Sequence, residues 1–138
     1  MNARMEEILK ERFGKDSIIA LATVSDGRPC VRNVDAIYED GAFYVLTHAL
    51  SNKMKQIGEN PTVAIAGEWF TANGRGENMG YFSKTENARI AEKMREAFAA
   101  WIDNGHNDFS DENTCILRID LTDGVLIADG ERYEIEFV

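Results

Sequence analysis

Four Asp-Gly dipeptides constrain the fold of this chain more than any other feature. They stand at positions 26–27, 40–41, 123–124 and 129–130, and apolar runs flank each of them. Asp and Gly tolerate positive φ, which the tight turns between antiparallel strands require. We therefore interpret each dipeptide as a turn, and their distribution predicts a series of β-hairpins.

Apolar and β-branched runs between these turns predict short strands. We expect strands over 18–24, 29–38, 43–46, 62–71, 115–121, 125–128 and 133–137, and a loop over 73–80. Helices are expected over 3–13 and 85–101, where apolar residues repeat at intervals of three and four, and a short helix is expected after Ser51. The predicted fold class is mainly β (α+β). Because no long apolar helix is available to cover a sheet, the antiparallel strands are expected to close into a barrel with flanking helices.

The length and charge of the chain limit its organisation and its partners. A chain of 138 residues predicts one domain, 1–138. The net charge of -9 repels phosphate polymers, so we expect no binding to nucleic acid or to a membrane. Cys30 and Cys115 form no CxxC motif, which favours buried thiols in a reducing cytoplasm. The N-terminal segment lacks the apolar core of a signal peptide, so the expected location is cytoplasmic.

The stretch from Phe43 to Ile57 contains the strongest local indication of a ligand. A strand reaches Thr47, and a short helix begins after Ser51, which is a good N-cap residue. Free backbone N–H groups at a helix start, with a hydroxyl and two lysines beside them, can hold an anion such as a phosphate. An ordinary strand-to-helix turn with solvated lysines explains the same pattern, so the local sequence leaves both interpretations open.

The predicted strand over 29–38 is irregular, because Arg32, Asn33 and Asp35 interrupt its apolar residues. Polar residues in the middle of such a strand either face solvent or reach into a site.

The order of these motifs resembles the pyridoxamine 5'-phosphate oxidase-like family of FMN-binding split barrels. The segment ATVSDGRPCVR at 22–32 is similar to the opening hairpin of that family. The runs FYVLT at 43–47, SNK at 51–53 and NPTVA at 60–64 resemble its next strand, its phosphate-binding turn and its following strand. The resemblance extends from about Ile8 to Val138, and it is strongest before Phe70.

The resemblance implies a split β-barrel, a homodimer, and FMN bound in a cleft shared between protomers. By position, Arg32, Asn33 and Val34 would lie along the flavin, Leu46 and Thr47 would flank it, and Ser51, Asn52 and Lys53 would hold its phosphate. Trp69 joins this set as a residue that either stacks on the flavin or packs in the core.

The expected function is that of an FMN-dependent oxidoreductase acting on an unidentified small molecule, in which the flavin performs the redox step. The alternatives are a flavin- or haem-binding storage or sensor protein without turnover, and a regulatory dimer whose site has decayed. The sequence ends without the arginine-bearing C-terminal motif of pyridoxamine phosphate oxidases, so we do not expect oxidation of that vitamer.

The two histidines are not assigned to the site. His48 follows the predicted phosphate strand, and we interpret it as a surface-turn residue, with contact to the ligand as the alternative. His106 stands among acidic residues whose spacing fits no standard set of metal ligands, so we expect a solvated loop and no metal.

Overall fold

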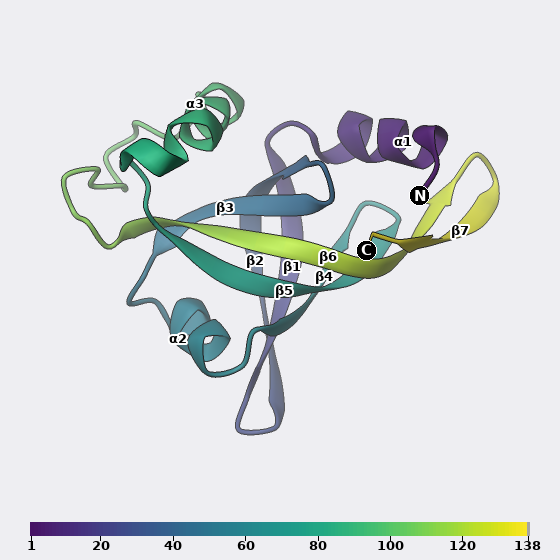
Figure 1. Ribbon diagram of the computed structural model, residues 1–138, viewed down its shortest axis with the longest axis horizontal. Helices are drawn as coiled ribbons and strands as arrows, with labels where there is room; N and C mark the ends of the chain where they lie inside the picture. Colours follow the sequence, from purple (N-terminus) through teal and green to yellow (C-terminus); the bar gives the residue numbers. More distant parts are fainter. Residues whose placement is uncertain (138) are drawn as a thin grey trace.

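The computed structural model describes residues 1–137, which form an antiparallel β-barrel with helices around it (Figure 1). The strands are β1 (Ser17–Ser25), β2 (Arg28–Glu39), β3 (Ala42–His48), β4 (Thr62–Gly67), β5 (Phe70–Tyr81), β6 (Thr114–Ala128) and β7 (Glu131–Glu136). The helices are α1 (Ala3–Phe13), α2 (Asn52–Glu59) and α3 (Ala88–Ala97), and the 3₁₀ turn η1 (Thr85–Asn87) precedes α3. Val138, the last residue of the predicted domain, lies outside the described residues.

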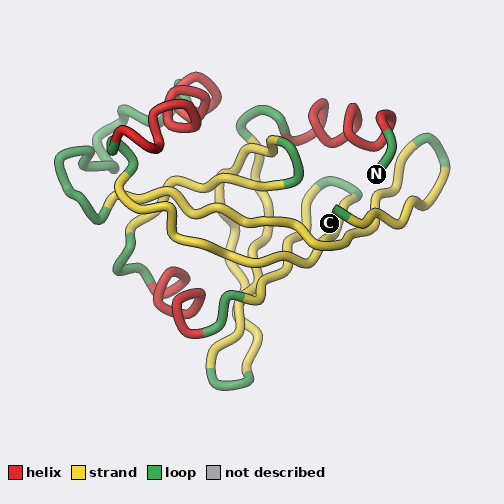
Figure 2. The backbone as a smooth tube through the Cα atoms, viewed as in Figure 1, coloured by secondary structure: helices red, strands yellow, loops and turns green. Residues whose placement is uncertain are grey.

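The sheet closes on itself. Its strand order is β3-β2-β1-β4-β5-β6-β7, and β3 also pairs with β6. The ring therefore consists of β3, β2, β1, β4, β5 and β6, while β7 extends from β6 as a hairpin (Figure 2). Closure gives each strand of the ring a partner on both sides, which removes the exposed edges of an open sheet. The predicted mainly β split barrel is confirmed.

Alternation along each strand places one set of side chains inside the barrel. On β1 the inward residues are Ile19, Leu21 and Thr23, all nearly inaccessible to solvent. The helix α1 closes one end of this interior with the apolar face that its sequence predicts. The ring of Phe13 lies 5.6 Å from that of Phe43, edge to face, and the Tyr38 hydroxyl donates to Glu6 of α1 at 2.7 Å.

The other end of the barrel is closed by α2. Ile57 of this helix packs directly on Gly76 of β5, and Gln56 is hydrogen-bonded to Thr23 at the far end of β1. The two helices therefore lie at opposite ends of β1, as Figure 1 shows. A third position is taken by α3, which covers the outer face of β2, β3 and β6. Its residues Ile90 and Met94 belong to a second apolar cluster with Tyr44 of β3.

Two expectations about the middle of the chain are wrong. The predicted strand over 62–71 is interrupted by a turn before Phe70, and the predicted loop over 73–80 is part of β5. Glycines are required here by packing rather than by a loop. A Cβ at Gly74 would lie 2.6 Å from the carbonyl oxygen of Asp120, and one at Gly76 would lie 2.8 Å from Ile57.

The predicted turn at 123–124 is also wrong, because β6 runs through it without a break. The long helix expected over 85–101 is shorter, since regular α-helix spans only Ala88–Ala97. Cys30 and Cys115 are free thiols, and the expectation that both are buried is wrong for Cys30. Cys115 is buried, whereas Cys30 is partly exposed because it lies close to the β1–β2 turn.

Candidate functional site

Several of the predicted cofactor-binding residues come together at the end of the barrel that α2 closes. Ser51 is the N-cap of α2, and Lys53 lies in its first turn. Arg32 reaches α2 from β2, because its Nη2 donates to the Gln56 side chain at 2.9 Å. Thr47 is paired with Cys115 across β3 and β6, and the charge of Lys53 acts on the Cys115 thiol. The order of strands thus gathers residues that are far apart in sequence.

The Arg32 guanidinium is held only by uncharged groups. Its Nη1 donates to the Leu21 carbonyl oxygen at 3.2 Å and to the Thr23 hydroxyl at 2.8 Å. Its Nη2 donates to Gln56, and the Thr23 hydroxyl donates to the same amide oxygen at 2.6 Å. Within residues 1–137 no carboxylate forms an ion pair with Arg32 or with Lys53.

Lys53 provides a second positive charge in the same place. Burial, and then the charge of Arg32, lowers the pKa of its ammonium group below the ordinary value of 10.5. Two neighbouring cations without a counter-anion repel each other, and a bound anion would relieve that repulsion. The pair is therefore suited to a dianionic group such as a phosphate monoester.

Within residues 1–137 the Ser51 hydroxyl likewise lacks a partner. An N-cap serine normally accepts a hydrogen bond from a backbone N–H in the first turn, but Ser51 makes no such bond. Its Oγ is buried, and it has no hydrogen-bond partner among the described residues. An unpaired buried hydroxyl costs about 1–3 kcal/mol. The first N–H groups of α2 also lack intrahelical acceptors, so an anion at this helix start would satisfy both kinds of group.

The remaining predicted residues are more dispersed. Asn33 is exposed, Val34 packs against the barrel core, and Leu46 packs against the cluster under α3. Asn52 is the first residue of α2, next to Ser51 and Lys53, and its side chain is exposed. Trp69 is 69% exposed in the turn between β4 and β5, at the end of β4 away from α2. Core packing of Trp69 is therefore wrong, and within one chain this residue does not approach the cations.

Two residues of this site, Thr23 and Gln56, were not expected from the sequence. Thr23 could have been found, because it follows Ile19 and Leu21 on the inward face of β1 and is 1% exposed. A hydroxyl inside an apolar barrel needs a polar partner. Gln56 gave no local indication, because its role depends on how α2 packs against β1.

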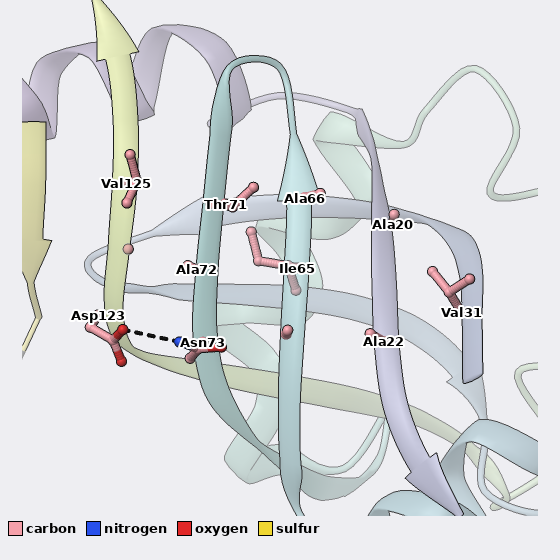
Figure 3. Close-up of a pocket in the computed structure, with 12 residues that line it drawn as sticks. Ala20, Ala22, Val31, Ile65, Ala66, Thr71, Ala72, Asn73, Asp123 and Val125 are labelled. Carbon is pink, nitrogen blue, oxygen red and sulfur yellow. Dashed lines mark hydrogen bonds between the residues drawn. The ribbon is translucent and has the colours of Figure 1, made fainter. Parts of the chain in front are cut away.

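A shallow apolar hollow of about 300 Å3 lies on the outer face of the barrel (Figure 3). Two cross-strand rows form it. One row is Val31, Ala22, Ala64, Asn73 and Asp123, and the other is Ala20, Ala66, Thr71 and Val125. The small alanine side chains of β1 and β4 make the floor, and the Asn73 amide donates to Asp123 at 3.0 Å along one side.

The histidines lie outside this arrangement. His48 is the half-buried last residue of β3 and not a turn residue, and its Nε2 lies 2.9 Å from Asp111 Oδ2, so it joins β3 to the loop before β6. His106 is exposed. In the part of the chain that the structure describes, no three His, Cys, Asp or Glu side chains are grouped as metal ligands would be. Over the same residues, no helix has the length and apolar character needed to cross a membrane.

Comparison with known proteins identifies the family. The family model for pyridoxamine 5'-phosphate oxidase matches residues 5–126. The chain belongs to this family. The match covers the barrel up to Leu126 of β6 and includes the α2 site, whereas no curated protein matches the chain in sequence.

Solved structures agree with the family at the level of fold. General stress protein 26 from Bacillus anthracis superposes with a TM-score of 0.72 at 18% identity, covering 96% of this chain and 99% of that one. An FAD-binding protein from Mesorhizobium loti gives 0.68 at 16% identity, covering 90% and 92%. A haem storage protein from Vibrio cholerae gives 0.64 at 19% identity, covering 86% and 87%. At such identities these likenesses show the fold alone.

Proposed function

We propose that this protein binds FMN and holds the flavin phosphate at the start of α2. The proposal rests on one observation: Arg32 and Lys53 share the end of the barrel with the buried Ser51 hydroxyl, and no carboxylate in residues 1–137 pairs with either cation. An acidic protein of net charge -9 has many carboxylates available. A cationic site that remains free of them is suited to an external anion.

The residues around α2 can supply a complete set of phosphate contacts. Arg32 and Lys53 donate charge-assisted hydrogen bonds, Ser51 donates its hydroxyl, and Asn52 and Lys53 offer backbone N–H groups at the helix start. Thr47 lies next to this set on β3. The side chains of Val34 and Leu46 pack against the barrel core and against the cluster under α3, so they are not part of this set of phosphate contacts.

We further propose that the protein is an oxidoreductase. Bound FMN supplies the redox chemistry, by exchanging electrons with a small molecule. The chain itself then needs to bind and orient the flavin and to exclude water, and no acid or base from the protein is required. A storage or sensor protein would use the same site without turnover.

A homodimer is part of the same proposal. Ile18 of β1 and Val31 of β2 are 67% and 70% exposed, and both stand on the alanine-rich outer face that α3 leaves uncovered. An exposed apolar surface of this kind is typical of an interface, and a second copy of the chain offers an identical, self-complementary surface. Asn33 lies on this face and Trp69 at the turn of β4 and β5, so both would contact flavin only across the subunit boundary.

Titration of the ligand-free protein tests the proposal. We expect FMN fluorescence to be quenched on binding, and FMN to bind more tightly than riboflavin, which has the same ring and no phosphate. The absorption spectrum of the purified protein distinguishes flavin from haem, which gives a Soret band. Equal affinity for FMN and riboflavin would reject the phosphate site, and a lack of binding by either would reject the flavin assignment. Oxidation of NADH or NADPH by the loaded protein then separates an enzyme from a storage protein.

A further inference from the structure

Among the described residues, three of the five N–H groups of the Arg32 guanidinium donate hydrogen bonds. Both hydrogens of Nη1 are used, toward the Leu21 carbonyl and the Thr23 hydroxyl. One hydrogen of Nη2 is used, toward Gln56. The Thr23 hydroxyl and the Gln56 amide oxygen therefore both lie at the edge of the guanidinium formed by Nη1 and Nη2. A hydrogen bond of 2.6 Å joins these two groups.

This pattern leaves a defined edge of Arg32 available. A guanidinium has five N–H groups in a plane, and Nε–H lies beside one hydrogen of Nη2 on a single edge. Within residues 1–137, Nε and this second hydrogen have no acceptor. Two parallel N–H groups on one edge match two oxygens of a phosphate or carboxylate.

We infer that Thr23 and Gln56 are positioning residues that fix Arg32 for bidentate contact with a phosphate monoester. This inference rests on the proposed function, because it concerns how the same site recognises its anion. Thr23 is 1% exposed and anchored in β1, so it cannot follow a moving side chain. Gln56 arrives from α2, which also carries Ser51 and Lys53. The hydrogen bonds thus fix the guanidinium relative to the other phosphate donors.

The neutrality of Gln56 is central to the inference. A glutamine accepts from Arg32 without cancelling its charge. A glutamate of almost the same shape would form an ion pair with Arg32 and would also lie on the helix of Lys53. The site would then hold its own anion, and selectivity for the phosphate of FMN would fall.

The test is Gln56→Glu, with FMN and riboflavin titrated separately into the full-length protein. We expect the ratio of the riboflavin to the FMN dissociation constant to fall about tenfold or more, while the riboflavin constant itself is unchanged. Lys10→Gln is the matched control, because it alters the net charge by the same one unit at an exposed position of α1, at the opposite end of the barrel. It should leave the ratio nearly unchanged. Gln56→Met removes the acceptor without adding charge, and we expect a smaller fall in the ratio.

The outcomes separate this inference from the proposed function. If the unmodified protein binds FMN no better than riboflavin, the phosphate site itself is rejected. If the unmodified protein prefers FMN and Gln56→Glu keeps that preference, Thr23 and Gln56 do not position Arg32. A merely structural role would weaken both ligands equally, so an unchanged ratio with loss of both also contradicts the inference. If Gln56→Glu does not fold, Gln56→Met decides the question. An unchanged ratio of the riboflavin to the FMN dissociation constant in Gln56→Met would then contradict the inference.

Discussion

Lys53 and Arg32 reach the same end of the barrel from α2 and β2, and burial, followed by the charge of Arg32, lowers the pKa of the Lys53 ammonium. The folded protein therefore releases this proton more readily than the unfolded chain does. Between the lowered pKa and the ordinary value of 10.5, the unfolded state binds more protons, so the stability of the ligand-free protein rises with pH in that window. A bound phosphate favours the charged lysine and opposes this effect.

FMN binding should accordingly weaken as the pH rises through the lowered pKa of Lys53. The neutral amine loses its charge-assisted contact with the phosphate. Titration with FMN between about pH 7 and about pH 10 measures this, with riboflavin as the reference for changes in the flavin ring. In Lys53→Arg the side chain stays protonated, so the fall should disappear. If the FMN affinity of Lys53→Arg falls by the same amount as the pH rises, a group other than Lys53 titrates.

Removal of either cation should weaken FMN binding strongly. We expect Arg32→Ala and Lys53→Ala each to cost about 1.5–3 kcal/mol, the range for hydrogen bonds to charged groups. Riboflavin binding should change little, because the lost contacts are to phosphate. Isothermal titration measures both ligands. Unchanged FMN curves in both variants would remove these residues from the site.

Ser51→Ala should have opposite effects on stability and binding. The Ser51 hydroxyl is buried and unpaired within the described part of the chain, and it makes no capping bond. Its removal should therefore raise the free energy of unfolding of the ligand-free protein by about 1 kcal/mol, while FMN affinity falls by about 1 kcal/mol. Urea denaturation with and without FMN measures both. A less stable ligand-free variant would mean that the hydroxyl has a partner in the folded protein.

The Asp-Gly dipeptides show how far turn chemistry alone predicts this fold. Three of them are turns, and both residues have positive φ at 26–27, 40–41 and 129–130. The fourth, Asp123–Gly124, lies inside β6. A Cβ at Gly124 would lie 2.7 Å from the Thr71 carbonyl oxygen, so glycine is needed there for close approach of β5. Sequence cannot separate these two reasons for a glycine, because the second depends on a strand that is distant along the chain.

Part of the candidate site could be predicted from the sequence, and part could not. Arg32, Ser51 and Lys53 could be found, because an arginine in a strand and a serine and a lysine at a helix start are local features. The contacts of Arg32 with Thr23 and Gln56 could not, since they depend on the packing of α2 against β1. The exposure of Trp69 could not be predicted either, because an aromatic pair at 69–70 is typical of a strand and gives no sign of the turn before Phe70.

The attachment of α3 should depend on pH through Glu39. This carboxylate accepts from Arg89 and from Lys93 of α3, each at 2.6 Å. The Arg89 hydrogen bond, and then that of Lys93, lowers the pKa of Glu39 from 4.5 to about 2. A lowered pKa gives stability that is present above the unfolded value of 4.5 and is lost as pH falls through about 2.

Glu39→Gln should lower the free energy of unfolding by about 1 kcal/mol near pH 7, a modest value because Arg89 is largely exposed. The difference from the unmodified protein should shrink as the pH falls from 4.5 toward 2. Urea denaturation across this range measures it, and Glu59→Gln on the exposed side of α2 is the control. A difference that stays constant with pH would show that the loss comes from packing and not from charge.

Ala66→Arg should convert the proposed dimer into a folded monomer. Ala66 is exposed in the centre of the outer face, where it is paired with Ala20 on one side and Thr71 on the other. An arginine here points into solvent in one subunit, so the barrel core is undisturbed, but it places two like charges in a self-complementary interface. Ala100→Arg adds the same side chain beyond α3 and should leave the dimer intact. Sedimentation velocity at micromolar concentration distinguishes the two forms, and a dimer that survives Ala66→Arg would show that another surface forms the interface. FMN titration of the monomer then shows whether one subunit suffices, because a cleft shared between subunits predicts weaker binding of both FMN and riboflavin.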